Sequence, residues 1–127
     1  MDGLVIKSTN ISPAVEFYPD GHLNLEGKII TENAVITFDP IFNWIKDFHA
    51  KKVEFNIYLE YMNTSATMQL FSLLNKLDEN CEIEQISIKW YYEEDDEEHL
   101  ETGEIFEERL ERSNFEFIEV RERRHVA

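Results

Sequence analysis

The residues best suited to chemistry lie in a short hydroxyl-rich segment, residues 61–67, with the sequence Tyr-Met-Asn-Thr-Ser-Ala-Thr. An alternating apolar run precedes this segment and a leucine-rich run follows it, so we expect a strand to end and a helix to begin there. A hydroxyl on Thr64 or Ser65 would then be presented on a rigid turn between two elements. Phosphate on such a hydroxyl adds about −1.5 to −2 charges at neutral pH. The segment therefore suggests a phosphorylation switch.

Two other roles fit the same segment. Asn63, Thr64 and Ser65 are residue types preferred at helix N-caps, so a purely structural capping role is the first alternative. The second alternative is a small-molecule or anion-binding domain that uses the helix N-terminus after Asn63. Ligands dock at the carboxyl ends of strands in α/β sheets, and the amides and dipole of a helix start favour negative groups. The residues alone leave these explanations open.

No other group of residues forms a catalytic or metal-binding pattern. The histidines have no pair at the i, i+4 spacing typical of zinc sites; they are His22, His49, His99 and His125. The single cysteine, Cys81, lies among acidic residues that disfavour a reactive thiolate. The chain also lacks a nucleophile-elbow motif and a glycine-rich phosphate loop. We therefore expect no enzyme activity, no cofactor and no metal; an enzyme that uses the acidic residues 93–98 is the least favoured alternative.

Charge is concentrated in one part of the chain. The 127 residues include 27 Asp and Glu against 12 Lys and Arg, a formal net charge of −15. Residues 93–112 hold eleven acids against Arg109 and Arg112, so this segment alone carries −9. Because nucleic-acid binding needs a basic face, nucleic acid is excluded as a partner. The acidic segment either forms a solvated face or attracts a basic partner, and its spacing does not match an EF-hand calcium loop.

Length and composition favour a single domain over residues 1–127. Nine Phe, five Tyr and two Trp supply more apolar rings than a disordered acidic chain contains. The sequence begins without a basic segment followed by an apolar core, and no stretch approaches the roughly 18 apolar residues of a membrane span. We expect a cytoplasmic protein with no membrane insertion.

The elements that must position residues 61–67 follow from hydrophobic periodicity. Alternating runs on both sides of Pro19-Asp20-Gly21 predict an antiparallel β-hairpin. Asp39-Pro40 predicts the start of a first helix that ends near Ala50. Residues 52–62 form the longest predicted strand, with Val53, Phe55, Ile57, Leu59 and Tyr61 on one side. A helix follows Asn63, a strand covers residues 84–92, the acidic segment forms a third helix, and residues 115–120 form the last strand.

The predicted order is thus β-β-α-β-α-β-α-β. Strands that alternate with helices need crossover connections, so the later strands should be parallel and covered by helices. The predicted fold class is α/β, a small mixed sheet opened by an antiparallel hairpin.

With residues 61–65 as the best match, the chain resembles the SiaC family of bacterial regulatory phosphoproteins. Supporting motifs are Ser12-Pro13-Ala14, Glu32-Asn33-Ala34, Phe42-Asn43-Trp44-Ile45 and Ile88-Lys89-Trp90-Tyr91-Tyr92 followed by acids. The resemblance covers nearly the whole chain and implies a fold like the anti-sigma-factor-antagonist (STAS) domain. One departure is that Ile29 and Thr31 stand between Gly27 and Glu32 where the family pattern has Ser and Pro.

The resemblance also implies a function. In this family a serine/threonine protein kinase with a histidine-kinase-like ATPase fold phosphorylates the threonine of the Asn-Thr-Ser motif, and a PP2C-type phosphatase removes the phosphate. The unphosphorylated protein, which is not an enzyme, binds and activates a diguanylate cyclase and so raises cyclic-di-GMP and favours biofilm or aggregation. Carried to this sequence, the phosphoacceptor is Thr64, with Ser65 as the runner-up. The partner-binding residues are then Tyr61, Asn63, Thr64 and Ser65.

Overall fold

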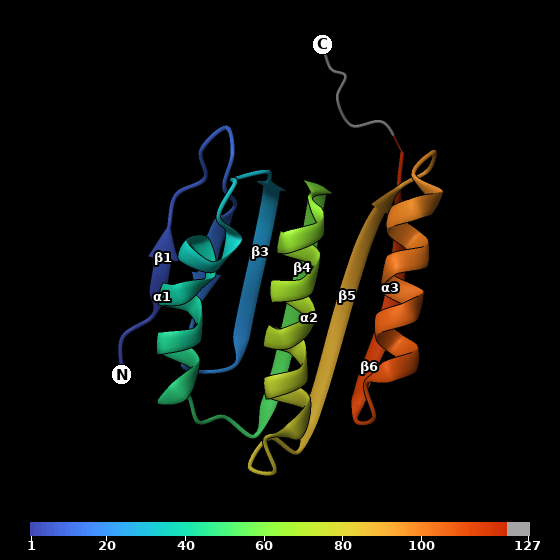
Figure 1. Ribbon diagram of the computed structural model, residues 1–127. Helices are drawn as coiled ribbons and strands as arrows, with labels where there is room; N and C mark the ends of the chain where they lie inside the picture. The colour runs from blue at the N-terminus through green and yellow to red at the C-terminus, as the bar shows by residue number, and fades with distance from the viewer. Residues whose placement is uncertain (122–127) are drawn as a thin grey trace.

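The computed structural model describes residues 1–121 and contains one six-stranded sheet and three helices (Figure 1). His125 lies outside the described residues. The strands are β1 (Leu4–Ile6), β2 (Ala14–Phe17), β3 (His22–Ile29), β4 (Lys52–Met62), β5 (Gln85–Glu93) and β6 (Ser113–Val120). The helices are α1 (Ala34–Lys46), α2 (Thr64–Glu79) and α3 (Glu97–Arg109).

The strands follow one another across the sheet in the order in which they occur in the chain. The β1–β2 and β2–β3 pairs are antiparallel, and the β3–β4, β4–β5 and β5–β6 pairs are parallel. All three helices lie over the same face of the sheet (Figure 1). The predicted α/β class, a mixed sheet opened by an antiparallel hairpin with parallel later strands, is confirmed. Strand β1 is an addition, because three residues are too few to give a periodic signal.

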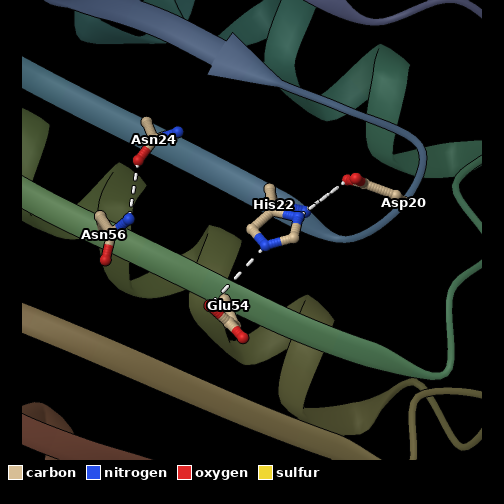
Figure 2. Close-up of polar contacts among 5 residues, drawn as sticks. All are labelled: Asp20, His22, Asn24, Glu54 and Asn56. Atoms are coloured by element: carbon tan, nitrogen blue, oxygen red, sulfur yellow. Dashed lines mark hydrogen bonds and ion pairs between the residues drawn. The ribbon is translucent and has the colours of Figure 1, made fainter.

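The core fills the space between the sheet and the helices. Every second residue of the central strands is buried on the helix side, as in the Val53, Phe55, Ile57 and Leu59 series of β4. The opposite face is polar, and its side chains pair across strands (Figure 2). The Asn56 side-chain amide donates to Asn24 Oδ1 at 2.8 Å, and His22 lies 3.2 Å from Asp20 and 3.8 Å from Glu54.

The predicted start of the first helix is wrong. Helix α1 begins at Ala34, with Asn33 as its N-cap, and Pro40 lies inside the helix rather than at its first position. Proline removes one hydrogen bond, to the carbonyl four residues earlier. That carbonyl belongs to Ile36, a residue that is 65% exposed, so water can satisfy it. The apolar stripe of the helix starts earlier than predicted, with Ala34, Phe38 and Ile41 buried.

The predicted position of Tyr61 on the core side of its strand is also wrong. Tyr61 is 55% exposed, whereas Leu59 is buried. The reason is a register shift between β3 and β4: Gly27 pairs with Leu59, but the next residue, Lys28, pairs with Tyr61. Glu60 is the additional residue of this bulge, and Gly27 adopts a φ of +122°, which glycine accommodates readily. The bulge turns the end of β4 outward just before residues 61–67.

Candidate functional site

Residues 61–67 form a strand-to-helix elbow at the carboxyl end of β4, and Asn63 holds it in place. The Asn63 side-chain oxygen accepts the Ala66 N–H at 2.9 Å, and its carbonyl accepts the Thr67 N–H at 2.9 Å. Its side-chain amide donates to the Thr31 carbonyl at 3.0 Å, and its backbone N–H donates to the Ile29 carbonyl at 3.1 Å. Asn63 therefore caps α2 and ties the elbow to the end of β3. The sequence placed Asn63 in a partner-binding surface, and its observed contacts are structural.

Thr64 and Ser65 are the first two residues of α2, and both are exposed. Asn63 accepts the backbone N–H groups of Ala66 and Thr67. The backbone N–H groups of Thr64 and Ser65 have no acceptor among residues 1–121. The two hydroxyl side chains thus project from a rigid helix start whose partial positive charge favours a negative group. The structure brings together all four residues that the sequence singled out here, with Tyr61 exposed at the end of β4.

Beside the elbow is a cavity of about 300 Å³ between the end of β4, the start of α2 and the start of α3. Its lining is Glu60, Tyr61, Met62, Asn63, Thr64, Thr67, Asp96, Glu98, His99 and Thr102. Three of these side chains are carboxylic acids, and no Lys or Arg among residues 1–121 lines the cavity. Fixed negative charge around the cavity opposes a free anion, so the lining disfavours the predicted anion-binding alternative.

The α3 wall of this cavity is fixed by Trp90, which is fully buried on β5. Its indole N–H donates to the His99 carbonyl at 3.1 Å, and its ring stacks on the His99 ring at 4.8 Å. Gly103 lies against the same ring so closely that a Cβ there would be 2.7 Å from Trp90 Nε1. Sequence reasoning did not identify His99 or Gly103 as site-forming. The one available signal was the lone glycine inside a helical acidic run, which often marks a close approach between elements.

Burial also alters His99 itself. The side chain is 7% exposed, and removal from water lowers the pKa of its imidazole below the usual value, against the opposing effect of the Asp96 carboxylate. His99 Nε2 is buried and has no hydrogen-bond partner in the range that the structure describes, residues 1–121. The neutral ring is therefore part of the cavity wall. Asp96 lies beside it as the N-cap of α3, and its carboxylate accepts the His99 backbone N–H at 3.1 Å.

An apolar rim surrounds the elbow. Ten large hydrophobic residues of the described chain are exposed, and six of them lie at this end of the sheet: Ile11, Ile30, Val35, Ile36, Tyr61 and Met68. Two hydrogen bonds draw the connecting loops together, from the Ile30 N–H to the Ile11 carbonyl at 2.9 Å and from Asn63 to Thr31. Clustered exposed apolar residues mark protein interaction sites more often than isolated ones do.

Comparison with known proteins agrees with this geometry. The sequence model that describes SiaC family regulatory phosphoproteins matches residues 6–120. The chain belongs to the SiaC family. An uncharacterised protein of Pseudomonas aeruginosa strain UCBPP-PA14 is 28% identical over 113 residues, which cover 85% of this chain and 90% of that protein.

Solved SiaC structures share the fold. Apo-SiaC of Pseudomonas aeruginosa superposes with a TM-score of 0.75 at 26% identity, over 93% of this chain and 99% of that one. A second structure contains the diguanylate cyclase SiaD in complex with its activator SiaC, also from Pseudomonas aeruginosa. The match has a TM-score of 0.76 at 27% identity and covers 92% of this chain and 99% of the other. The family is thus one of regulatory phosphoproteins, and one of its members activates a diguanylate cyclase.

Two further features of residues 1–121 concern metals and membranes. Within this range, no three His, Cys, Asp or Glu side chains are grouped so that they could hold a metal ion. None of the three helices combines the length and the apolar character that a bilayer-spanning segment needs.

Proposed function

We propose that this chain is a non-enzymatic switch protein that binds and regulates an output protein, a diguanylate cyclase, and is controlled by reversible phosphorylation of Thr64. The observation that carries the proposal is an exposed hydroxyl at the capped start of α2 with an apolar rim around it. The family supplies the classes of partner. They are a kinase with a histidine-kinase-like ATPase fold, a PP2C-type phosphatase and a cyclase, all acting in the cytoplasm on a single domain.

The elbow explains how one phosphate would change binding. The backbone there is fixed by Asn63, so a phosphate would alter charge and shape rather than refold the site. Within the described part of the chain, the cavity beside Thr64 is lined by carboxylates and by no Lys or Arg, so no basic side chain of that lining neutralises the added charge. The charge would remain at the centre of the apolar rim, where burying it against a partner is costly.

The assignment to Thr64 is tested with a purified serine/threonine kinase of the histidine-kinase-like class that the proposal names, and with Mg-ATP. We expect one phosphate, mapped to Thr64 by mass spectrometry, and none in the Thr64→Ala variant. Phosphate that persists on Ser65 in Thr64→Ala would move the switch by one residue. Phosphate elsewhere in the chain would overturn the assignment. The Ser65→Ala variant, altered at the adjacent hydroxyl of the same cap, is the matched control and should still be phosphorylated.

The Thr64→Asp variant should bind the cyclase at least about tenfold more weakly than the unmodified chain, because it buries a charge in the interface. Isothermal titration calorimetry with the purified cyclase measures this difference. The Asn114→Asp variant adds the same charge on an exposed residue of β6 and should bind normally. Equal affinities for Thr64→Asp and the unmodified chain would show that the elbow is outside the interface.

A small-molecule binding domain remains the alternative function. A module of that kind should gain thermal stability from nucleotides or phosphorylated metabolites, because a ligand that binds only the native state raises its melting temperature. The acidic cavity lining leads us to expect no such shift.

A further inference from the structure

A groove runs between α2 and α3, starting at the elbow and ending near the opposite end of both helices. It consists of three adjoining cavities. Thr67 lines both the elbow cavity and the middle one, and Arg109 lines both the middle one and the last. The middle cavity has a volume of about 320 Å³ and is lined by Thr67, Met68, Phe71, Ile105, Phe106 and Arg109.

The middle of this groove is apolar and open to solvent. Met68 is 67% exposed and Ile105 is 49% exposed, one on each helix. Below them, the rings of Phe71 and Phe106 pack at 5.1 Å and close the floor between the two helices. Exposed aliphatic side chains above an aromatic floor are typical of grooves that receive the apolar face of a helix.

The two walls have matching spacing. The groove-lining residues on α2 include Thr64, Met68, Phe71 and Asn75, and those on α3 include Glu98, Thr102, Ile105 and Arg109. Both series follow i, i+4, i+7, i+11, so each wall is one straight stripe along its helix. At 1.5 Å per residue each stripe is roughly 17 Å long, which matches about three turns of a bound helix.

The charge around the groove selects its occupant. Helix α3 contains six glutamates against one arginine, a net charge of −5. The arginine, Arg109, lines the middle and last cavities, and the glutamates outnumber it along the outer edge of the groove. On a helical projection, the exposed Glu101 and Glu108 lie just to the solvent side of the Ile105 stripe. A second copy of this chain, with a net charge of −15, would bring like charge against this rim, and an anionic membrane surface would do the same. A basic segment would be attracted to it.

We propose that the α2–α3 groove binds a basic amphipathic helix of a protein partner. The apolar residues of that helix would pack between Met68 and Ile105, and its Lys or Arg residues would face Glu98, Glu101 and Glu108. The inference rests on the proposed function for the identity of that partner, the regulated output protein. It adds a second contact that begins at Thr64, shares Met68 with the apolar rim and continues between α2 and α3. A phosphate on Thr64 would then stand at the open end of the groove.

The test uses two synthetic 18-residue helical peptides. The first consists of leucine and lysine, and the second, its matched control, carries glutamate in place of each lysine. The unphosphorylated full chain is titrated with each peptide and followed by 1H–15N NMR. We expect the lysine peptide to shift the signals of Met68, Phe71 and Ile105, and the glutamate peptide to bind at least about tenfold more weakly. No kinase or cyclase is needed, so the groove and the Thr64 switch can fail independently.

Two matched variants separate groove binding from general attraction between opposite charges. Ile105→Gln removes an exposed apolar side chain from the groove without a change in charge, and should weaken lysine-peptide binding about tenfold. Val5→Gln makes a similar exchange at a 61% exposed residue of β1 and should leave binding unchanged. Both residues are on the surface, so both variants should fold.

Four results would overturn the proposal. The first is equal weakening by Ile105→Gln and Val5→Gln, and the second is shifts confined to another surface. The third is equal binding of the two peptides or no binding of either. The fourth is a dimer in sedimentation experiments that Ile105→Gln dissociates, because the groove would then belong to a second copy of the chain.

Discussion

Asn63 determines the geometry of the elbow through bonds to two different elements. It caps α2 through Ala66 and also donates to the Thr31 carbonyl in the loop after β3. Asn63→Ala removes both bonds and should lower the free energy of unfolding by about 1–3 kcal/mol, since a cap contributes about 1 kcal/mol and a further hydrogen bond a similar amount. Urea unfolding followed by circular dichroism measures the loss.

Asn33 provides the matched control for Asn63. It caps α1 through the Ile36 N–H at a longer distance of 3.4 Å. We expect Asn33→Ala to cost less than Asn63→Ala, about 0.5 kcal/mol. If the two variants lose the same stability, the bond from Asn63 to Thr31 does not contribute to holding the elbow.

Gly103 determines how closely α3 approaches the sheet. A Cβ at this position would be 2.7 Å from the Trp90 ring, which is fully buried and has no room to move. Gly103→Ala should therefore destabilise the protein by about 1–3 kcal/mol, although Gly to Ala inside a helix otherwise stabilises by up to about 1 kcal/mol. Thermal or urea unfolding shows whether the Gly103→Ala variant is less or more stable than the parent. Glu104→Ala, at the exposed next residue of the same helix, should stay within about 0.5 kcal/mol of the parent.

At the scale of the element, α3 is held on β5 through the buried His99 ring, and this contact makes its stability depend on pH. Burial lowers the pKa of His99 in the folded state, whereas the unfolded chain takes up the proton at the ordinary value near 6.5. Below that value the unfolded state binds more protons, so stability falls as pH decreases. Between about pH 7.5 and pH 5.5 we expect a loss of at most about 1.4 kcal/mol per pH unit.

The His99→Phe variant isolates this effect, because phenylalanine keeps an aromatic ring against Trp90 and cannot be protonated. Urea unfolding of this variant should show a smaller change between the two pH values. Ser72→Ala, at an exposed residue of α2 that carries no titratable group, serves as the control and should keep the full pH dependence of the parent. An unchanged slope in His99→Phe would mean that another group titrates in this range.

Some elements could be predicted from the sequence more accurately than others. The periodicity of β4 and the Asn-Thr-Ser stretch predicted the elbow at the correct residues, since alternation and capping are local effects. The start of α1 was misplaced because Pro40 suggested a first turn, whereas burial of Ala34 and Phe38 in the core extends the helix past the proline. The exposure of Tyr61 and the place of His99 depend on a register shift and on packing against Trp90. Both are long-range contacts that local patterns do not contain.

At the scale of the whole molecule, one sheet face carries all three helices (Figure 1). Both proposed binding surfaces are formed by these helices and by loops at the ends of the strands. The apolar rim is at the carboxyl ends of the parallel strands, and the groove extends from it between α2 and α3. Most of the charge of −15 lies in residues 93–112, which carry −9 and include α3, next to that groove. The sequence left open whether this charge is a solvated face or an attractive patch, and the groove beside it favours a role in partner binding.

Repulsion among the closely spaced glutamates of α3 should lower the stability of the folded protein. Glu101, Glu104 and Glu108 follow one another at helical spacings of three and four residues, where like charges destabilise by about 0.2–0.5 kcal/mol per pair. Because salt screens this repulsion, raising sodium chloride from about 0.02 M to about 0.5 M should raise the melting temperature by a few degrees. The triple variant Glu101→Gln, Glu104→Gln, Glu108→Gln should lose most of that response in differential scanning calorimetry.

The comparison that decides between local and overall charge is a second triple variant, Glu16→Gln, Glu26→Gln, Glu116→Gln. It removes the same number of exposed acids from β2, β3 and β6. If repulsion within α3 dominates, this variant keeps the salt response of the parent. If both triple variants lose the response equally, net charge is the cause. The acids on α3 would then cost no more stability than the same number of acids elsewhere on the surface.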